Sequence, residues 1–175
     1  MLQLTAEHAT LILHGASLPA LKGEHRVTRN VISAIPADKA NYRPDDIAKS
    51  AFDLAWHIVS AEHRFMDGVI NGAFDFSGAG RPDTIQTPSD IVDWYVGQFA
   101  TDVERLKELS GEQLVKMIDF RGVIQLPAVT FVQVGTSHSI HHRGQLSTYL
   151  RPMGAKATAI APATKGCWCL AACSG

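Results

Sequence analysis

Two histidines spaced four residues apart carry the clearest chemical signal in this 175-residue chain. On a helix, His138 and His142 would lie one turn apart on the same face, where their imidazole nitrogens can converge on one metal ion. An HxxxH spacing alone is a weak signal, because many helices carry such a pair without a metal. A thermolysin-type zinc helix would also have Glu where this chain has Ser139. The spacing therefore indicates a metal pair, but not that hydrolase motif.

A third histidine, His57, shares a stripe at helical spacing with the apolar residues Leu54 and Phe65. A histidine on a buried face must be hydrogen-bonded, charged at a cost, or bound to a metal. A single core histidine is more often hydrogen-bonded to a backbone carbonyl. Three inward-facing histidines on two helices, however, favour metal binding. The candidate ligands are therefore His57, His138 and His142.

The other histidines lack such a setting. His141 lies about 100° around the helix from His142, so we expect it outside the metal site. The rest are predicted to lie on solvated faces or at helix caps: His8, His14, His25 and His63. Asp53, one turn before His57, is a candidate to orient that ring by spacing only. Arg143 and Gln145 are open to either a structural role or a substrate contact, and no catalytic residue is assigned.

Four long helices must position these residues. Their start and stop signals include Pro36 after the first helix, Ser50 as an N-cap, Thr87-Pro88, and Pro127. The predicted helices span about residues 18–35, 50–72, 88–109 and 127–151, with another helical piece possible before the first. Residues 73–87 are expected to form a crossing loop and residues 114–126 an irregular connection. With no convincing strands, the chain is predicted to be all-α, an antiparallel-type four-helix bundle.

The bulk composition fits one folded domain. Apolar residues make up 46% of the chain, the net charge is −1, and Lys and Arg form no run. These values speak against a nucleic-acid partner, and no stretch approaches the roughly 18 apolar residues that a membrane span needs. We expect a soluble, cytoplasmic protein.

The C-terminal segment is set apart by its cysteines. Cys167, Cys169 and Cys173 form CxC and CxxxC spacings, which suit neither a structural zinc site nor a disulfide framework. We expect one domain over residues 1–160 and a disordered or atypical tail over residues 161–175. This tail is expected to be dispensable for folding.

Several short motifs lie along the chain: Asn41-Tyr42-Arg43-Pro44, Leu54-Ala55-Trp56-His57, Ser60-Ala61-Glu62 and the run from His138 through His142-Arg143-Gly144-Gln145 to Gly154. Over about residues 18–156, these motifs together resemble those of the DinB-like (DinB/YfiT) family of damage-inducible four-helix bundles. The resemblance implies a bundle with one ligand from the second helix and two from the fourth, which are His57, His138 and His142. It also implies one divalent ion, zinc or nickel and in some members iron, and a homodimer. The tail does not match the family pattern.

Three functions stay open from the sequence. The resemblance implies a metal-dependent transferase or isomerase acting with a low-molecular-weight thiol such as mycothiol, bacillithiol or glutathione. Three neutral imidazoles leave a tetrahedral ion an open position at which such a thiol would be held as thiolate. The alternative is a non-catalytic stress-response protein that binds a metal or small ligand. A metal-dependent hydrolase is the weaker alternative, because no acid at helical spacing is an evident general base.

Overall fold

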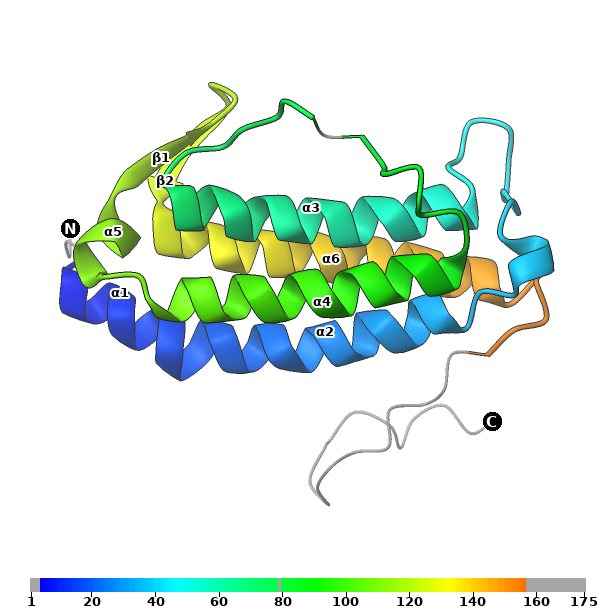
Figure 1. Cartoon of the computed structure of the whole chain (residues 1–175), viewed down its shortest axis with the longest axis horizontal. Coiled ribbons are helices and arrows are strands. Elements are labelled where there is room, and N and C mark those ends of the chain that lie inside the picture. Colours follow the sequence, from blue (N-terminus) through cyan, green and yellow to red (C-terminus); the bar gives the residue numbers. More distant parts are fainter. Residues whose placement is uncertain (1–3, 79, 157–175) are drawn as a thin grey trace, which may run out of the picture.

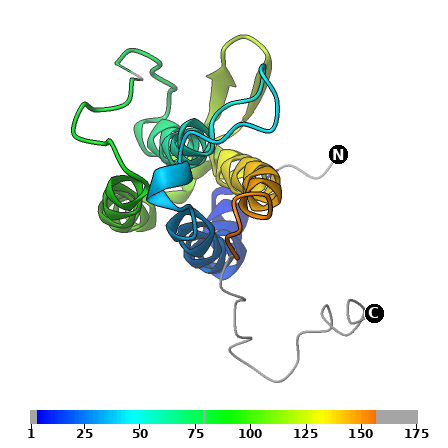
Figure 2. The ribbon, with the colours of Figure 1, turned by 90° about the vertical axis from the view of Figure 1, so that its right-hand side faces the viewer.

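Four long helices lie side by side in the computed structural model, which describes residues 4–78 and 80–156 (Figure 1). They are α2 (Leu18–Ser33), α3 (Ala51–Asn71), α4 (Pro88–Lys107) and α6 (Ala128–Leu150). Viewed end-on, each helix occupies one corner of the bundle (Figure 2). Helix α3 packs against α4 and α6, and α2 packs against the same two helices. The predicted four-helix bundle is confirmed.

The connection between α3 and α4 sets the direction of the helices. Its described residues cross the length of the bundle, so α3 and α4 run the same way, opposite to α2 and α6 (Figure 1). The predicted crossing loop is therefore present. The bundle is not wholly antiparallel as expected, because a long crossover lets consecutive helices lie parallel.

Capping residues determine where α3 and α4 begin and where α3 ends. The Ser50 hydroxyl accepts the Asp53 backbone N–H at 3.0 Å and donates to the Asp53 carboxylate at 2.6 Å, which fixes the start of α3. Gly72 ends that helix with φ of +68°, a conformation that favours glycine. Thr87 and Asp90 form a complete capping box at the start of α4.

Shorter elements complete the chain. Before α2 lie α1 (Ala6–Ile12) and a π-helical turn (Leu13–Ser17), and a 3-10 turn (Ala37–Lys39) follows it. Helix α5 (Gly111–Val115) precedes two strands, β1 (Met117–Phe120) and β2 (Ile124–Pro127). None of the described helices is both long and apolar enough to span a membrane. The predicted tail, residues 161–175, lies outside the described residues.

The two strands correct the prediction of an irregular connection over residues 114–126. They pair antiparallel, with Ile118 opposite Leu126 and Phe120 opposite Ile124. The turn between them has positive φ at both central residues, 57° at Arg121 and 69° at Gly122. Such turns usually carry Asn or Asp before the glycine, and Arg at that position concealed the hairpin.

The α3–α6 interface brings the backbones of two helices together. A Cβ built on Gly135 of α6 would come within 2.7 Å of the Phe65 Cβ of α3. Only glycine fits this contact without displacement. The close approach matters because the same two helices carry the candidate metal ligands.

Candidate metal centre

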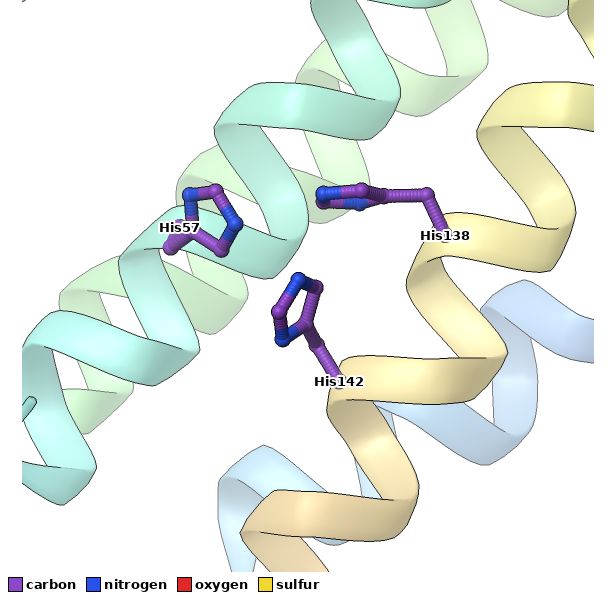
Figure 3. A group of neighbouring side chains, drawn as sticks. All are labelled: His57, His138 and His142. Atoms are coloured by element: carbon purple, nitrogen blue, oxygen red, sulfur yellow. The ribbon is translucent and has the colours of Figure 1, made fainter. Parts of the chain in front are cut away.

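The three predicted ligands meet across the α3–α6 interface. His57 projects from α3, and His138 and His142 project from successive turns of α6 toward it (Figure 3). One ring nitrogen of each residue lies within 4.8 Å of the other two. The ring centroids are 5.0 Å apart for His57 and His138, 4.7 Å for His57 and His142, and 4.5 Å for His138 and His142. This arrangement can place three imidazole donors around a single ion.

The surroundings of these rings favour their neutral form. Burial, followed by the nearby His142, lowers the pKa of His138 to about 4. Burial also lowers the pKa of His57, as do His142, Lys49 and Arg64. A metal binds the deprotonated imidazole, so a depressed pKa reduces competition from protons. The donor set therefore fits a divalent cation of the kind that prefers nitrogen ligands.

Hydrogen bonding distinguishes the two histidines of α6. His142 Nδ1 lies 3.1 Å from Gln145 Oε1, so this nitrogen donates and Nε2 is left as the available ligand atom. His138 Nδ1 is buried and has no hydrogen-bond partner among residues 4–78 and 80–156. A buried ring nitrogen without a partner is costly, and a bound cation or ordered water would satisfy it.

Asp53 does not orient His57, contrary to the suggestion from spacing. One of its carboxylate oxygens accepts from Ser50 and lies 3.6 Å from Arg43, and the other lies 3.1 Å from Arg81. These contacts tie the start of α3 to neighbouring loops. The carboxylate therefore has other partners than the candidate metal site.

Two further residues near the triad can now be placed. His141 is exposed and lies outside the triad, with its ring centroid 4.9 Å from that of His142. Arg143 joins α6 to α2: its guanidinium lies 2.6 Å from the Glu24 carboxylate and 3.2 Å from Thr28 Oγ1. These contacts link α6 to α2 within the bundle.

Two histidines predicted on solvated faces or caps are partly buried instead. The His25 ring stacks on Phe99 with 3.7 Å between ring centroids. The His63 Nδ1 lies 2.6 Å from a carboxylate oxygen of Asp102, whose side chain is fully buried. The sequence held a signal for this pair. Asp102 follows Tyr95 and Phe99 at helical spacing, on the face that α4 buries.

A cavity of about 540 Å³ adjoins the triad on the His57 side. Three cationic side chains, those of Arg43, Lys49 and Arg64, line it together with one carboxylate, that of Asp53. The excess of positive charge favours an anionic ligand beside the triad.

Comparisons with known proteins agree with this architecture. A sequence model of the DinB family matches residues 10–165. The uncharacterized protein YjoA of Bacillus subtilis (strain 168) is 28% identical over 133 residues, which are 74% of this chain and 84% of that protein. A crystal structure of the DinB-like YjoA has a TM-score of 0.67 at 25% identity, covering 79% of this chain and 92% of that one. A DinB-like protein from Bacillus cereus, at 21% identity and a TM-score of 0.69, covers 82% and 95% and shares the fold.

Proposed function

The chain belongs to the DinB family, and on that premise we propose that His57, His138 and His142 hold one divalent metal ion. The observation that carries the proposal is the meeting of three partly buried histidines from two helices, with one ring nitrogen of each within 4.8 Å of the others. Three imidazoles suit zinc, nickel or iron better than magnesium or calcium, which prefer oxygen ligands. Zinc or nickel is the ion we expect. A cytoplasmic location remains a prediction from the composition, and a homodimer remains a prediction from the family resemblance.

Single substitutions test the ligand set. Metal content of untagged protein should be near one ion per chain, and His57→Ala, His138→Ala and His142→Ala should each lose most of it. Two imidazoles hold an ion poorly, so we expect at least a roughly tenfold weaker affinity in each variant. His141→Ala is the matched control, because this histidine lies on the same helix outside the triad and should leave the metal in place. Full occupancy in any one of the three variants would remove that residue from the site.

We further propose that the protein acts as a metal-dependent transferase or isomerase with a low-molecular-weight thiol. A bound divalent ion would supply a position at which a thiol is held as thiolate. The chain itself supplies the surroundings: Arg43, Lys49 and Arg64 provide positive charge for an anionic ligand in the cavity beside His57. The wall of that cavity also includes Trp56, which offers an apolar surface.

A non-catalytic metal- or ligand-binding stress protein is the alternative, and a spectroscopic titration separates the two. Cobalt-substituted protein should develop a sulfur-to-metal charge-transfer band when mycothiol, bacillithiol or glutathione is added. His142→Ala protein, treated identically, should show no band. If all three thiols leave the wild-type spectrum unchanged, the thiol-dependent activity is wrong and the binding protein is favoured.

A hydrolase is less well supported by the geometry. Asp53, the acid nearest to His57 in sequence on α3, is paired with Arg43 and Arg81. A general base must reach the proton that it abstracts, and this carboxylate is engaged elsewhere.

A further inference from the structure

His63 of α3 and Asp102 of α4 form a second cluster of titratable groups, apart from the histidine triad. His63 Nδ1 lies 2.6 Å from Asp102 Oδ2, and Asp102 Oδ1 accepts the Gln98 side-chain N–H at 3.1 Å. The Asp102 side chain has no exposed surface, whereas 29% of the His63 side chain is exposed. Both oxygens of the buried carboxylate are therefore bonded, and the imidazole reaches from that carboxylate toward the surface.

This arrangement selects one form of the His63 ring. A carboxylate only accepts hydrogen bonds, so the neutral ring must carry its proton on Nδ1 and leave Nε2 unprotonated. The Nε2 lone pair of the neutral ring can therefore accept a hydrogen bond from a ligand outside the pair.

The exposed part of His63 faces a cavity of about 290 Å³ between α3, α4 and the crossing loop. The indole rings of Trp56 and Trp94 also line this cavity, with their centroids 4.9 Å apart. The His63 ring stands edge-on to Trp94 at 5.6 Å. The volume is at the small end of ligand sites, and the two indoles offer contact area for a planar ring.

The charges around the cavity specify the ligand further. Asp67 lies 3.4 Å from Arg105, and Asp75 accepts hydrogen bonds from the Ser77 backbone N–H and hydroxyl. Arg64 also lines the cavity and makes no ion pair within the described part of the chain. Asp75 makes no ion pair within the described residues either, but Ser77 bonds to both of its carboxylate oxygens, whereas the Arg64 guanidinium donates no hydrogen bond to a described residue. A guanidinium with its donors unused, next to two indoles, favours a ligand that is both aromatic and negatively charged.

We propose that this cavity binds a small planar aromatic acid. The ring of the ligand packs against Trp56 and Trp94, its acid group meets Arg64, and a polar group of the ligand hydrogen-bonds to His63 Nε2. Asp102 is a positioning residue that holds the imidazole. The cavity shares Trp56, Ser60 and Arg64 with the larger cavity at His57, so the bound acid lies beside the triad, but the proposal does not rest on a metal there.

Binding to the full-length chain tests the proposal. Trp168→Phe removes the third tryptophan, so that the fluorescence reports on Trp56 and Trp94. 4-Hydroxybenzoate should then change the emission saturably, and 4-hydroxybenzyl alcohol and 4-hydroxycyclohexanecarboxylate should bind at least about tenfold more weakly. Loss of a hydrogen bond to a charged partner typically costs about ten- to a hundredfold in affinity, so His63→Gln and Arg64→Gln should weaken binding by that order. His8→Gln, a change at an exposed histidine of α1, should bind normally.

The results also separate this proposal from the metal site and from a purely structural pair. His57→Ala should lose metal yet keep 4-hydroxybenzoate binding, because His57 does not line this cavity. No saturable binding by the parent protein would overturn the proposal. It would also be overturned if His63→Gln melted at a lower temperature but bound the acid as tightly as the parent.

Nitrogen NMR tests the role of Asp102 directly. In protein with ¹⁵N-labelled histidine, the neutral His63 ring should be protonated on Nδ1, and 4-hydroxybenzoate should shift its Nε2 resonance. Asp102→Asn should reduce the Nδ1-protonated fraction and weaken binding by about tenfold. If that variant does not fold, the wild-type spectrum alone tests the proposal. A neutral His63 ring protonated on Nε2 would contradict it, and so would an Nε2 resonance that does not shift when 4-hydroxybenzoate is added.

Discussion

His25 shows how much the surroundings of a single residue can change its chemistry. The ring packs between α2 and α4, with centroids 3.7 Å from Phe99 and 4.2 Å from Tyr95. Burial, with the Arg29 charge as the second cause, lowers its pKa to about 4. The ring is therefore neutral in the folded protein under conditions in which it is protonated in the unfolded chain.

This difference in pKa predicts a loss of stability in mild acid. Below about pH 6.5 the unfolded state binds a proton that the folded state does not, so the free energy of unfolding should fall from there to about pH 4. For a partly buried ring, the loss at pH 5 should be about 1–2 kcal/mol. His25→Phe keeps an aromatic ring and cannot ionise. Urea unfolding of chelator-treated protein should show that this variant reduces the difference in stability between pH 7 and pH 5 by that amount.

The exposed His8 provides the control. His8→Gln should leave the pH dependence as it is in the wild type. An unchanged pH difference in His25→Phe would mean that the His25 ring is as easily protonated in the folded protein as in the unfolded chain.

The sequence located the triad better than it located the other histidines, for a physical reason. The spacing of four residues places His138 and His142 on one helix face whatever the rest of the fold does. The partners of His25 and His63 lie on another helix, so their surroundings depend on how α2, α3 and α4 pack. A charged residue such as Asp102 at a core position was the available signal, and it was overlooked.

At the scale of the elements, the contact between α3 and α6 depends on one glycine. Gly135→Ala would force its Cβ to within 2.7 Å of the Phe65 Cβ, so the helices must separate. Overpacking of this kind should lower the free energy of unfolding by about 1–3 kcal/mol. It should also weaken metal binding, because the ligands sit on the two helices that move apart. Denaturant unfolding and a metal titration of the same variant measure both effects.

Gly144, on the same helix, is the matched control. Apart from its chain neighbours and the nearby backbone of its own helix, no atom lies within 4 Å of a Cβ built there, and the residue is exposed. Gly144→Ala should therefore stabilise the protein by about 0.5–1 kcal/mol through helix propensity alone and leave metal affinity unchanged. Equal effects of the two substitutions would show that the α3–α6 contact is not tight at Gly135.

The helices were predicted well where contacts between residues close in sequence determine their ends. Ser50, Gly72 and Thr87 fix their helix ends through contacts with immediate neighbours, so the sequence suffices. The hairpin was missed because Arg121 stands where such turns usually carry Asn or Asp, and its guanidinium lies 3.9 Å from the ring centre of Phe76, a residue far away in the sequence. A contact between distant residues cannot be seen in a short window of sequence.

For the molecule as a whole, we expect folding without metal and added stability with it. The bundle has its own continuous apolar core, so chelation should leave helical content in place. An ion at a hundred times its dissociation constant contributes about 2.7 kcal/mol, which corresponds to roughly 5–10 °C in melting temperature for a chain of this size. Thermal melts followed by circular dichroism, with and without chelator, measure the shift. His57→Ala should show no shift, and complete unfolding on chelation would contradict an independent core.

The proposed ligands that meet across the α3–α6 interface are far apart along the chain. Roughly 80 residues separate His57 from His138, so three-ligand binding requires the closure of a long loop, which is entropically costly. An ion present during refolding can bind the α6 pair early, but it gains its third ligand only when α3 and α6 have docked. The moment of tight metal uptake therefore marks the time at which these two distant parts of the chain meet. The rate of tight metal binding during refolding should therefore report the rate of this slow, long-range step of folding.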